Sequence, residues 1–262
     1  MKIFFAEHLP DYKNYSFPYQ VLLLREKGDY VDEIYNSGFL PMRNEKNIFY
    51  LARSVRVELN NFELSSENRR IIKKTENFES DMIPLSEFKY SAYTQKLCKT
   101  YADERFGEKT FSTEGIKKIF SGLVYNYVFI FKNISNQEEV GYSVCFVSGS
   151  LIQYAHSFYN LSYLEDNLGA RMILEAVNWG KINNKKFAYL GTCYESSALY
   201  KTEFKGVEYF NGFKWSSSID ELKDLINRKN KEYLIKDTEF MEKHYQSNFE
   251  EIVNKFGIPF HF

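Results

Sequence analysis

Short apolar runs bounded by turn residues dominate the middle of the chain, a pattern typical of strands that bury at least one face. Three of these runs follow one another across tight turns and predict an antiparallel meander over Val124–Phe131, Glu139–Val147 and Leu151–Tyr159. Apolar residues then recur every three to four positions, which predicts a helix from Ala170 to Ile182. A further strand is predicted over Lys186–Leu190.

The same signals predict elements on either side of this region. Strands are expected at Ile3–Ala6, Tyr19–Leu24, Ile48–Leu51, Ser54–Leu59 and Tyr209–Trp215. Helices are expected at Asp29–Asn36, Ser65–Lys74, Ser86–Gly107, Ser112–Gly122, Ser196–Glu203 and Ile219–Val253. We expect an α+β protein in three parts: a smaller N-terminal lobe (1–83) that ends in a polar link over Thr75–Ile83, a central domain (84–217) and a helical, charged C-terminal tail (218–262).

Composition argues against several classes of protein. The 262 residues are enough for a substantial core, and the 18% of aromatic residues argue against disorder. A formal net charge of −1 creates no global attraction for nucleic acid, so any such binding needs a local basic patch. The three cysteines are far apart, which argues against a zinc ribbon or a disulfide framework. No apolar run approaches the roughly 18 residues needed to span a bilayer, so we expect a soluble, cytoplasmic protein.

The basic cluster near position 70 is the strongest candidate for such a patch. Ser65 is a good N-cap residue, and the helix that it starts carries Arg69, Arg70, Lys73 and Lys74. Residues four apart lie on one side of a helix, so these cations form two adjacent rows. Like charges in such rows repel one another, which favours an anionic partner. The alternative is a solvated helix face whose long side chains cover apolar surface.

The predicted elements follow one another as a meander, a helix behind a turn, a parallel strand, a short helix and a last strand. This order resembles the GNAT acyltransferase fold, in which the turn before the helix presents backbone N–H groups to the pyrophosphate of an acyl-CoA. The corresponding turn here is Asn167, Leu168, Gly169, Ala170 and Arg171. Glu165 and Asp166 precede it and would repel an anion. The alternative is a helix cap at Asn167 with Gly169 for close packing.

Two blocks of sequence carry more specific motifs. The first reads GFLPMRNEKNIFYLARSVRVELNNFELSSENRRIIKK and contains an Arg-Val step, a spaced Phe and a Ser-x-x-x-Arg-Arg-x-x-Lys run. The second reads FAYLGTCYESSALYKTEFKGVEYFNGFKW and contains a Tyr-x-Leu-Gly strand, a tyrosine–lysine pair and a closing tryptophan. Between them, HSFYNLSYLEDNLGARMILEAVNW forms a strand-to-helix segment. From about Gly38 to Trp215, these blocks resemble the arginyl-tRNA–protein transferases and their bacterial leucyl-transferring relatives.

The resemblance implies a GNAT-like fold that moves an aminoacyl group from a charged tRNA to the α-amine of a protein or peptide beginning with Asp, Glu or oxidised Cys. Aminolysis of an activated ester needs positioning, a proton acceptor and support for an oxyanion, so no cofactor is expected besides the aminoacyl-tRNA co-substrate. The basic cluster is expected to hold tRNA phosphates. Arg53 and Arg56 are candidates for the acidic side chain or the terminal adenosine. The metal-binding cysteines of many family members are absent, so no metal is implied.

Single residues near the predicted strand ends are candidates for the chemistry. Tyr200 lies where a GNAT protein places a phenolic acid, and Lys201 and Lys205 follow it, although solvated lysines and a core tyrosine are the alternative. Tyr189 ends a parallel strand, where open α/β sheets commonly bind ligands. His156 is the histidine expected near the centre of the fold, where a hydrogen-bonded core histidine is the alternative.

Two other classes of function stay open at this point. An acyl-CoA-dependent N-acyltransferase on the same fold would bind its donor at the turn 167–171. A non-catalytic module would bind acidic N-termini or RNA and move no acyl group.

Overall fold

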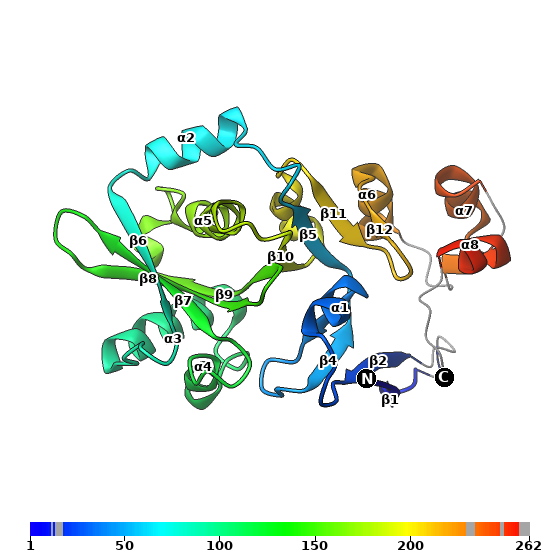
Figure 1. Ribbon diagram of the computed structural model, residues 1–262, viewed down its shortest axis with the longest axis horizontal. Helices are drawn as coiled ribbons and strands as arrows, with labels where there is room; N and C mark the ends of the chain where they lie inside the picture. The colour runs from blue at the N-terminus through cyan, green and yellow to red at the C-terminus, as the bar shows by residue number, and fades with distance from the viewer. Residues whose placement is uncertain (12, 14–17, 229–233, 247–248, 257–262) are drawn as a thin grey trace.

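The computed structural model describes residues 1–11, 13, 18–228, 234–246 and 249–256, which form two sheets with helices around them (Figure 1). The smaller sheet has the order β1-β2-β4-β3 and consists of β1 (Lys2–Glu7), β2 (Tyr19–Leu24), β3 (Phe39–Pro41) and β4 (Ile48–Leu51). The larger has the order β12-β11-β5-β10-β9-β8-β7-β6 and consists of β5 (Ser54–Glu58), β6 (Phe78–Pro84), β7 (Tyr127–Asn133), β8 (Glu139–Val147), β9 (Leu151–Tyr159), β10 (Phe187–Thr192), β11 (Val207–Phe210) and β12 (Trp215–Ser216).

The helices cover both faces of the larger sheet. Figure 1 shows α2 and α5 on one face and α3 and α4 on the other. The α-helices are α1 (Val31–Asn36), α2 (Ser66–Lys74), α3 (Ala92–Phe106), α4 (Thr113–Ile119), α5 (Leu168–Ile182), α6 (Ile219–Asn227), α7 (Thr238–His244) and α8 (Phe249–Phe256). The 3₁₀ segments are η1 (Leu161–Tyr163), η2 (Ser196–Thr202) and η3 (Leu234–Lys236). None of the described helices is long and apolar enough to cross a bilayer.

The predicted α+β class and the GNAT-like order of elements are confirmed by this topology. Strands β7 to β9 form the antiparallel meander expected of short apolar runs joined by turns, and β6 pairs antiparallel with β7 although α3 and α4 lie between them in the chain. Helix α5 then crosses the sheet, and β10 pairs parallel to β9. Parallel neighbours need such a crossover because a tight turn can only reverse the chain.

Strand β5 lies in the interior of the larger sheet, although it comes from the N-terminal part of the chain. It pairs antiparallel with β10 on one side and with β11 on the other. Val55 and Val57 in β5 are fully buried, as expected of an interior strand covered on its faces. The larger sheet therefore combines strands from both sides of residue 83, and the domain boundaries at 83 and 217 stay a prediction.

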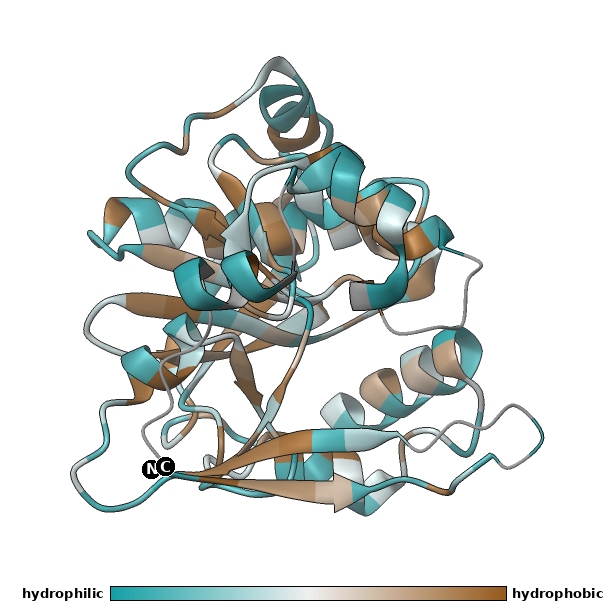
Figure 2. Ribbon diagram, turned by 90° about the vertical axis from the view of Figure 1, so that its right-hand side faces the viewer, coloured by the Kyte–Doolittle hydropathy of each residue, from teal (hydrophilic) through white to brown (hydrophobic). Residues whose placement is uncertain are grey.

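Two hydrophobic cores organise the molecule. The larger one fills both faces of the large sheet beneath α3, α4 and α5. The second joins the two sheets, where Tyr35 and Phe49 pack with Phe187 and Tyr189. Figure 2 shows hydrophobic residues concentrated along the strands and hydrophilic ones on the outward sides of the helices. The second core fixes the smaller sheet against the first half of β10, and the turn between β3 and β4 thereby lies at the site described below.

The prediction of a polar link over Thr75–Ile83 is wrong, because Phe78–Pro84 forms the edge strand β6. Glu79 and Asp81 are exposed, so the polar residues that suggested a link lie on the solvent face of a strand. An edge strand has one partner and tolerates such polarity.

Three other boundaries differ from those predicted. The helix expected from Ser86 begins at Ala92, because the Ser91 side chain and Thr94 form a capping box there. The expected last strand divides into β11 and β12 around Gly212, whose φ of +114° suits a reversal of the chain. The helical tail is present as separate helices α6, α7 and α8; its predicted parts at 229–233 and 247–248 lie outside the described residues.

Candidate functional site

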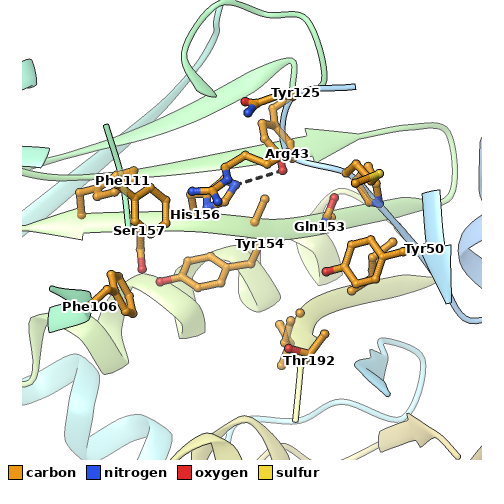
Figure 3. A pocket seen from close by; sticks show the side chains of 18 of the residues that line it. Arg43, Tyr50, Phe106, Phe111, Tyr125, Gln153, Tyr154, His156, Ser157 and Thr192 are labelled. Carbon is orange, nitrogen blue, oxygen red and sulfur yellow. Dashed lines mark hydrogen bonds between the residues drawn. The ribbon is translucent and has the colours of Figure 1, made fainter. Parts of the chain in front are cut away.

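A cavity of about 780 Å³ opens where the two parallel strands part. Strands β9 and β10 pair over Leu151–Gln153 and Phe187–Tyr189, and beyond these residues β9 continues to Tyr159 paired with β8 on its other side. The walls of the cavity come from both strands, from the end of α3, from the turn between β3 and β4, and from η2 (Figure 3). Ligands commonly bind at the carboxyl ends of parallel strands where the sheet opens, so this cavity is the candidate active site.

A β-bulge shapes the cavity wall. Val144 pairs with His156 and Cys145 with Tyr154, which leaves Ala155 opposite no residue of β8. A bulge bends its strand and redirects the neighbouring side chains and backbone groups. Among the described residues no strand pairs with the cavity side of β9 beyond Gln153, so its backbone N–H and C=O groups are available to an extended ligand.

Gln153 marks the inner end of the cavity and was not predicted from the sequence. It occupies the last paired position between β9 and β10, and its side chain is buried. The hydroxyl of Tyr35 donates a hydrogen bond of 2.5 Å to Gln153 Oε1. With the oxygen engaged in this way, the amide N–H groups of Gln153 are directed to donate toward the cavity that it lines.

His156 lies in the cavity as a neutral group. Burial and the nearby charge of Arg43 lower its pKa to about 3. Its Nε2 atom is 3.1 Å from the hydroxyl of Tyr125, and Figure 3 shows this hydrogen bond beside Arg43. A group with so low a pKa is a poor proton acceptor at neutral pH, so the structure suits His156 to hydrogen bonding and shaping of the wall.

Lys201 and Tyr200 line the same cavity from η2, opposite β9. The Lys201 ammonium donates a hydrogen bond of 2.8 Å to the carbonyl oxygen of Thr192, the last residue of β10. Burial lowers the pKa of Lys201, so its neutral amine is more accessible than in a solvated lysine. Tyr200 is about half exposed at the mouth. The structure thus brings three predicted residues, His156, Tyr200 and Lys201, into one cavity.

Tyr189 and Arg56, also predicted as site residues, lie elsewhere. Tyr189 is fully buried in the core between the two sheets and does not line the cavity. Arg56 forms an ion pair of 2.8 Å with Glu208, and its guanidinium lies between the rings of Phe187 and Trp215, at 3.9 and 3.8 Å. The contacts of both residues are within the protein.

The predicted basic helix is present as α2, with Ser65 as its N-cap. Its four cations, Arg69, Arg70, Lys73 and Lys74, are all exposed. Arg70 makes an ion pair with Glu67, Arg69 donates to a backbone carbonyl, and Lys74 donates to the carbonyl oxygen of Glu165. Helix α2 lies over α5 on one face of the sheet, whereas α3 approaches the cavity from the other (Figure 1). The cluster and the cavity are therefore separate surfaces.

The other two predicted binding residues are also outside the cavity lining. The guanidinium carbon of Arg53 lies 5.2 Å from the ring centroid of Tyr194, next to the end of β10. Lys205 forms an exposed ion pair of 2.7 Å with Glu63. In the described part of the chain, no group of three His, Cys, Asp or Glu side chains is arranged to hold a metal ion.

The predicted donor loop, 167–171, forms the first turn of α5 and likewise does not line the cavity. Asn167 adopts the left-handed conformation at φ +63°, and α5 begins at Leu168. A Cβ atom at Gly169 would lie 2.9 Å from the Tyr159 hydroxyl, so the tyrosine ring packs directly on this turn. Arg171 is engaged by Glu175 at 2.8 Å. These contacts agree with the packing interpretation of Gly169.

Arg43 is the second cavity residue that sequence reasoning missed. It lies in the turn between β3 and β4, which the backbone hydrogen bond from Met42 N to the carbonyl of Ile48 closes at 2.9 Å. Its guanidinium carbon is 4.2 Å from the ring centroid of Phe111. In the sequence Arg43 is one of several charged residues in a polar turn. It becomes part of the cavity wall only because the smaller sheet packs against the larger one.

Comparison with known proteins gives similarity of structure only. No protein-family model and no curated protein matches the sequence. Solved structures that match include the C-terminal domain of a protein assigned as a lysylphosphatidylglycerol synthetase from Agrobacterium fabrum, with 10% identity, a TM-score of 0.39, and coverage of 66% of this chain and 54% of that one. L-PGS from Bacillus licheniformis matches with 14% identity, a TM-score of 0.38, and coverage of 65% and 51%. FemX matches with 10% identity, a TM-score of 0.39, and coverage of 62% and 59%.

The chain thus spans about half the length of the first two of these structures. Because the identities and the scores are low, we infer the function from the cavity and its residues.

Proposed function

We propose that this protein is an aminoacyltransferase that moves an amino acid from a charged tRNA to the α-amine of a protein or peptide with an acidic N-terminus. The observation that carries the proposal is the cavity at the parting of β9 and β10, which combines hydrogen-bond donors at its inner end with a half-buried lysine, Lys201, on its wall. A cytoplasmic location goes with the proposal, since charged tRNA is the donor.

The cavity offers what aminolysis of an ester requires. The Gln153 amide and the backbone N–H groups of the bulged strand can donate to the oxyanion that forms when the amine attacks the ester carbonyl. The attacking nitrogen loses a proton as the C–N bond forms, and the ribose oxygen gains one as the C–O bond breaks. Lys201, whose pKa is lowered by burial, can accept the first proton in its neutral form and return it to the leaving oxygen.

The basic helix α2 is proposed to hold the tRNA phosphates at a distance from the chemistry. All four of its cations are exposed, and phosphate contacts of this kind supply affinity and register without reading a sequence. A tRNA is long enough to contact α2 while its charged end enters the cavity on the other side of the sheet. No resident cofactor is part of this proposal.

An acyl-CoA-dependent N-acyltransferase is the second candidate, because the order of elements and the bulged strand suit it equally. The turn before α5 argues against it. Tyr159 packs on Gly169, and the acidic pair Glu165 and Asp166 lies beside the position that a pyrophosphate would take. A binding module without catalysis is the third candidate, and it predicts affinity without transfer.

A transfer assay tests these candidates together. Purified protein is mixed with a pool of radiolabelled aminoacyl-tRNAs and with peptides that begin with Asp, Glu, Arg or Ala, and a parallel reaction contains labelled acetyl-CoA. We expect label on the Asp and Glu peptides only with charged tRNA, and loss of turnover in Lys201→Met but not in Lys118→Met, a matched change at an exposed lysine of α4. Label from acetyl-CoA alone would favour the second candidate, and no label from either donor would contradict both enzyme proposals.

A further inference from the structure

Arg43 has the environment of a ligand-binding residue. It lines the cavity, and its guanidinium carbon lies over the ring of Phe111, 4.2 Å from the centroid. Among the described residues, no carboxylate forms an ion pair with it, whereas Arg56, Arg70, Arg171 and Arg228 each have one. Glu45 lines the same cavity but makes no ion pair with Arg43. An arginine that rests on an aromatic ring and faces a cavity without an ion-pair partner is suited to bind an anion.

Apart from Glu45, the groups that line the cavity around Arg43 are polar and neutral. His156 is kept neutral by burial and by the arginine itself, and burial raises the pKa values of Tyr50 and Tyr125 although the Arg43 charge opposes that rise, so both hydroxyls keep their protons. Figure 3 shows Arg43 alongside His156 and Tyr125, facing the same space as Gln153 and Tyr50. An incoming anion would therefore meet one positive charge and several hydrogen-bonding groups.

This arrangement fits a carboxylate better than a phosphate. The ring of Phe111 covers one side of the guanidinium, and the two oxygens of a single carboxylate can accept two of its N–H groups in parallel. Phosphate sites usually combine several donors or cations. The other lysine or arginine on the cavity wall besides Arg43 is Lys201, which is directed at the Thr192 carbonyl at the carboxyl end of β10.

We infer that Arg43 is the specificity-determining residue of this site and binds the side-chain carboxylate of an acidic N-terminal residue on the acceptor. The inference rests on the proposed function and changes one part of the expectation from sequence, which gave this role to Arg53 and Arg56. The charge of Arg56 is already paired with Glu208, and Arg53 lies against Tyr194 outside the cavity lining.

Equilibrium binding of short peptides to the full chain tests this without any donor or turnover. Pairs of peptides that differ only in a first residue of Asp or Asn are titrated against wild type, Arg43→Gln, Arg43→Lys and Lys27→Gln. Lys27 is exposed and distant from any role described above, so its variant controls for the loss of one positive charge. Adenosine 5′-monophosphate is titrated in parallel as a probe for phosphate binding.

Wild type is expected to bind the Asp peptide roughly 10- to 100-fold more tightly than the Asn peptide. Arg43→Gln should bring this ratio close to one, Arg43→Lys should give an intermediate ratio because the charge remains without the fork, and Lys27→Gln should keep the wild-type ratio. An unchanged ratio in Arg43→Gln overturns the inference, as does a wild type with no preference for Asp. Loss of nucleotide affinity in Arg43→Gln with the peptide ratio intact would assign Arg43 to phosphate.

The peptide-binding experiment and the transfer assay can refute the Arg43 assignment and the proposed reaction independently of each other. A protein that prefers Asp through Arg43 but transfers nothing from charged tRNA contradicts the proposed reaction and keeps the assignment of Arg43. A protein that transfers the amino acid equally to Asp and Asn peptides contradicts the assignment and keeps the reaction.

Discussion

The contacts of Arg56 predict a structural role that can be measured as a change in stability. Replacing this residue by Met removes one half of a buried ion pair and leaves Glu208, whose side chain is 26% exposed, without its guanidinium. Removing one partner of a buried pair costs about 3–5 kcal/mol. The loss of two cation–π contacts adds to this cost, and the apolar contacts of the methionine chain offset it in part.

Because Glu208 keeps some contact with water, we expect the lower end of that range, about 3 kcal/mol in the free energy of unfolding. For a chain of this size, the melting temperature should fall by roughly 6–12 °C. Urea unfolding and thermal melting at neutral pH measure both quantities. Arg53→Met is the matched control, and it should cost less than about 1 kcal/mol because that guanidinium makes a single, partly exposed contact with Tyr194.

A double variant, Arg56→Met with Glu208→Met, separates lost packing from the unpaired charge. It should regain most of the lost stability, because no carboxylate is then left without a partner. The reasoning is refuted if Arg56→Met has the same melting temperature as wild type while its affinity for peptide or tRNA falls. That result would return Arg56 to the binding role expected from the sequence.

Two further predictions concern the surface and the cavity. The double variant Arg69→Glu, Arg70→Glu should weaken tRNA binding and flatten its salt dependence, while the far-UV circular dichroism and the melting temperature stay unchanged. The same charge reversal at Lys117 and Lys118 on α4 is the control. Equal weakening of tRNA binding in that control would contradict a role for α2. His156 has a folded pKa of about 3 and an ordinary value of 6.5, so the unfolded state binds the extra proton between these values. Stability should therefore fall by up to a few kcal/mol as pH drops from about 6.5 toward 3, and His156→Gln should flatten this dependence in urea titrations; an unchanged slope would show that His156 is not the group responsible.

Local patterns were sufficient for most elements of this fold. The meander, helix α5 and helix α2 with its Ser65 cap follow from apolar runs, helical periodicity and capping residues that act over a few positions. Strand β6 was missed because its outward residues are polar, and an edge strand needs burial on only part of its surface. The start of α3 was misplaced because several serines in one segment are equally good caps, and tertiary packing chooses among them.

The candidate site was only partly predictable for a related reason. Lys201 and Tyr200 belong to a motif that is contiguous in the chain, so a resemblance could point to them. Arg43 and Gln153 come from different sheets, and nothing within a few residues of either distinguishes it. Arg56 was assigned to ligand binding because it belongs to the Arg-Val step that carries the resemblance, whereas its contacts in the fold, Phe187 and Glu208, lie far away in the chain.

The interior position of β5 also constrains how this chain reaches its native state. Glu58 pairs with Phe187, and Val57 pairs with Val207, so both partners of β5 leave the ribosome long after it does. Until then β5, whose Val55 and Val57 are fully buried in the native fold, has unpaired edges and is open to chaperones and to aggregation. The large sheet can be completed only when most of the chain has been translated. We expect its slow step to be the insertion of β5 between β10 and β11, which are both synthesised later.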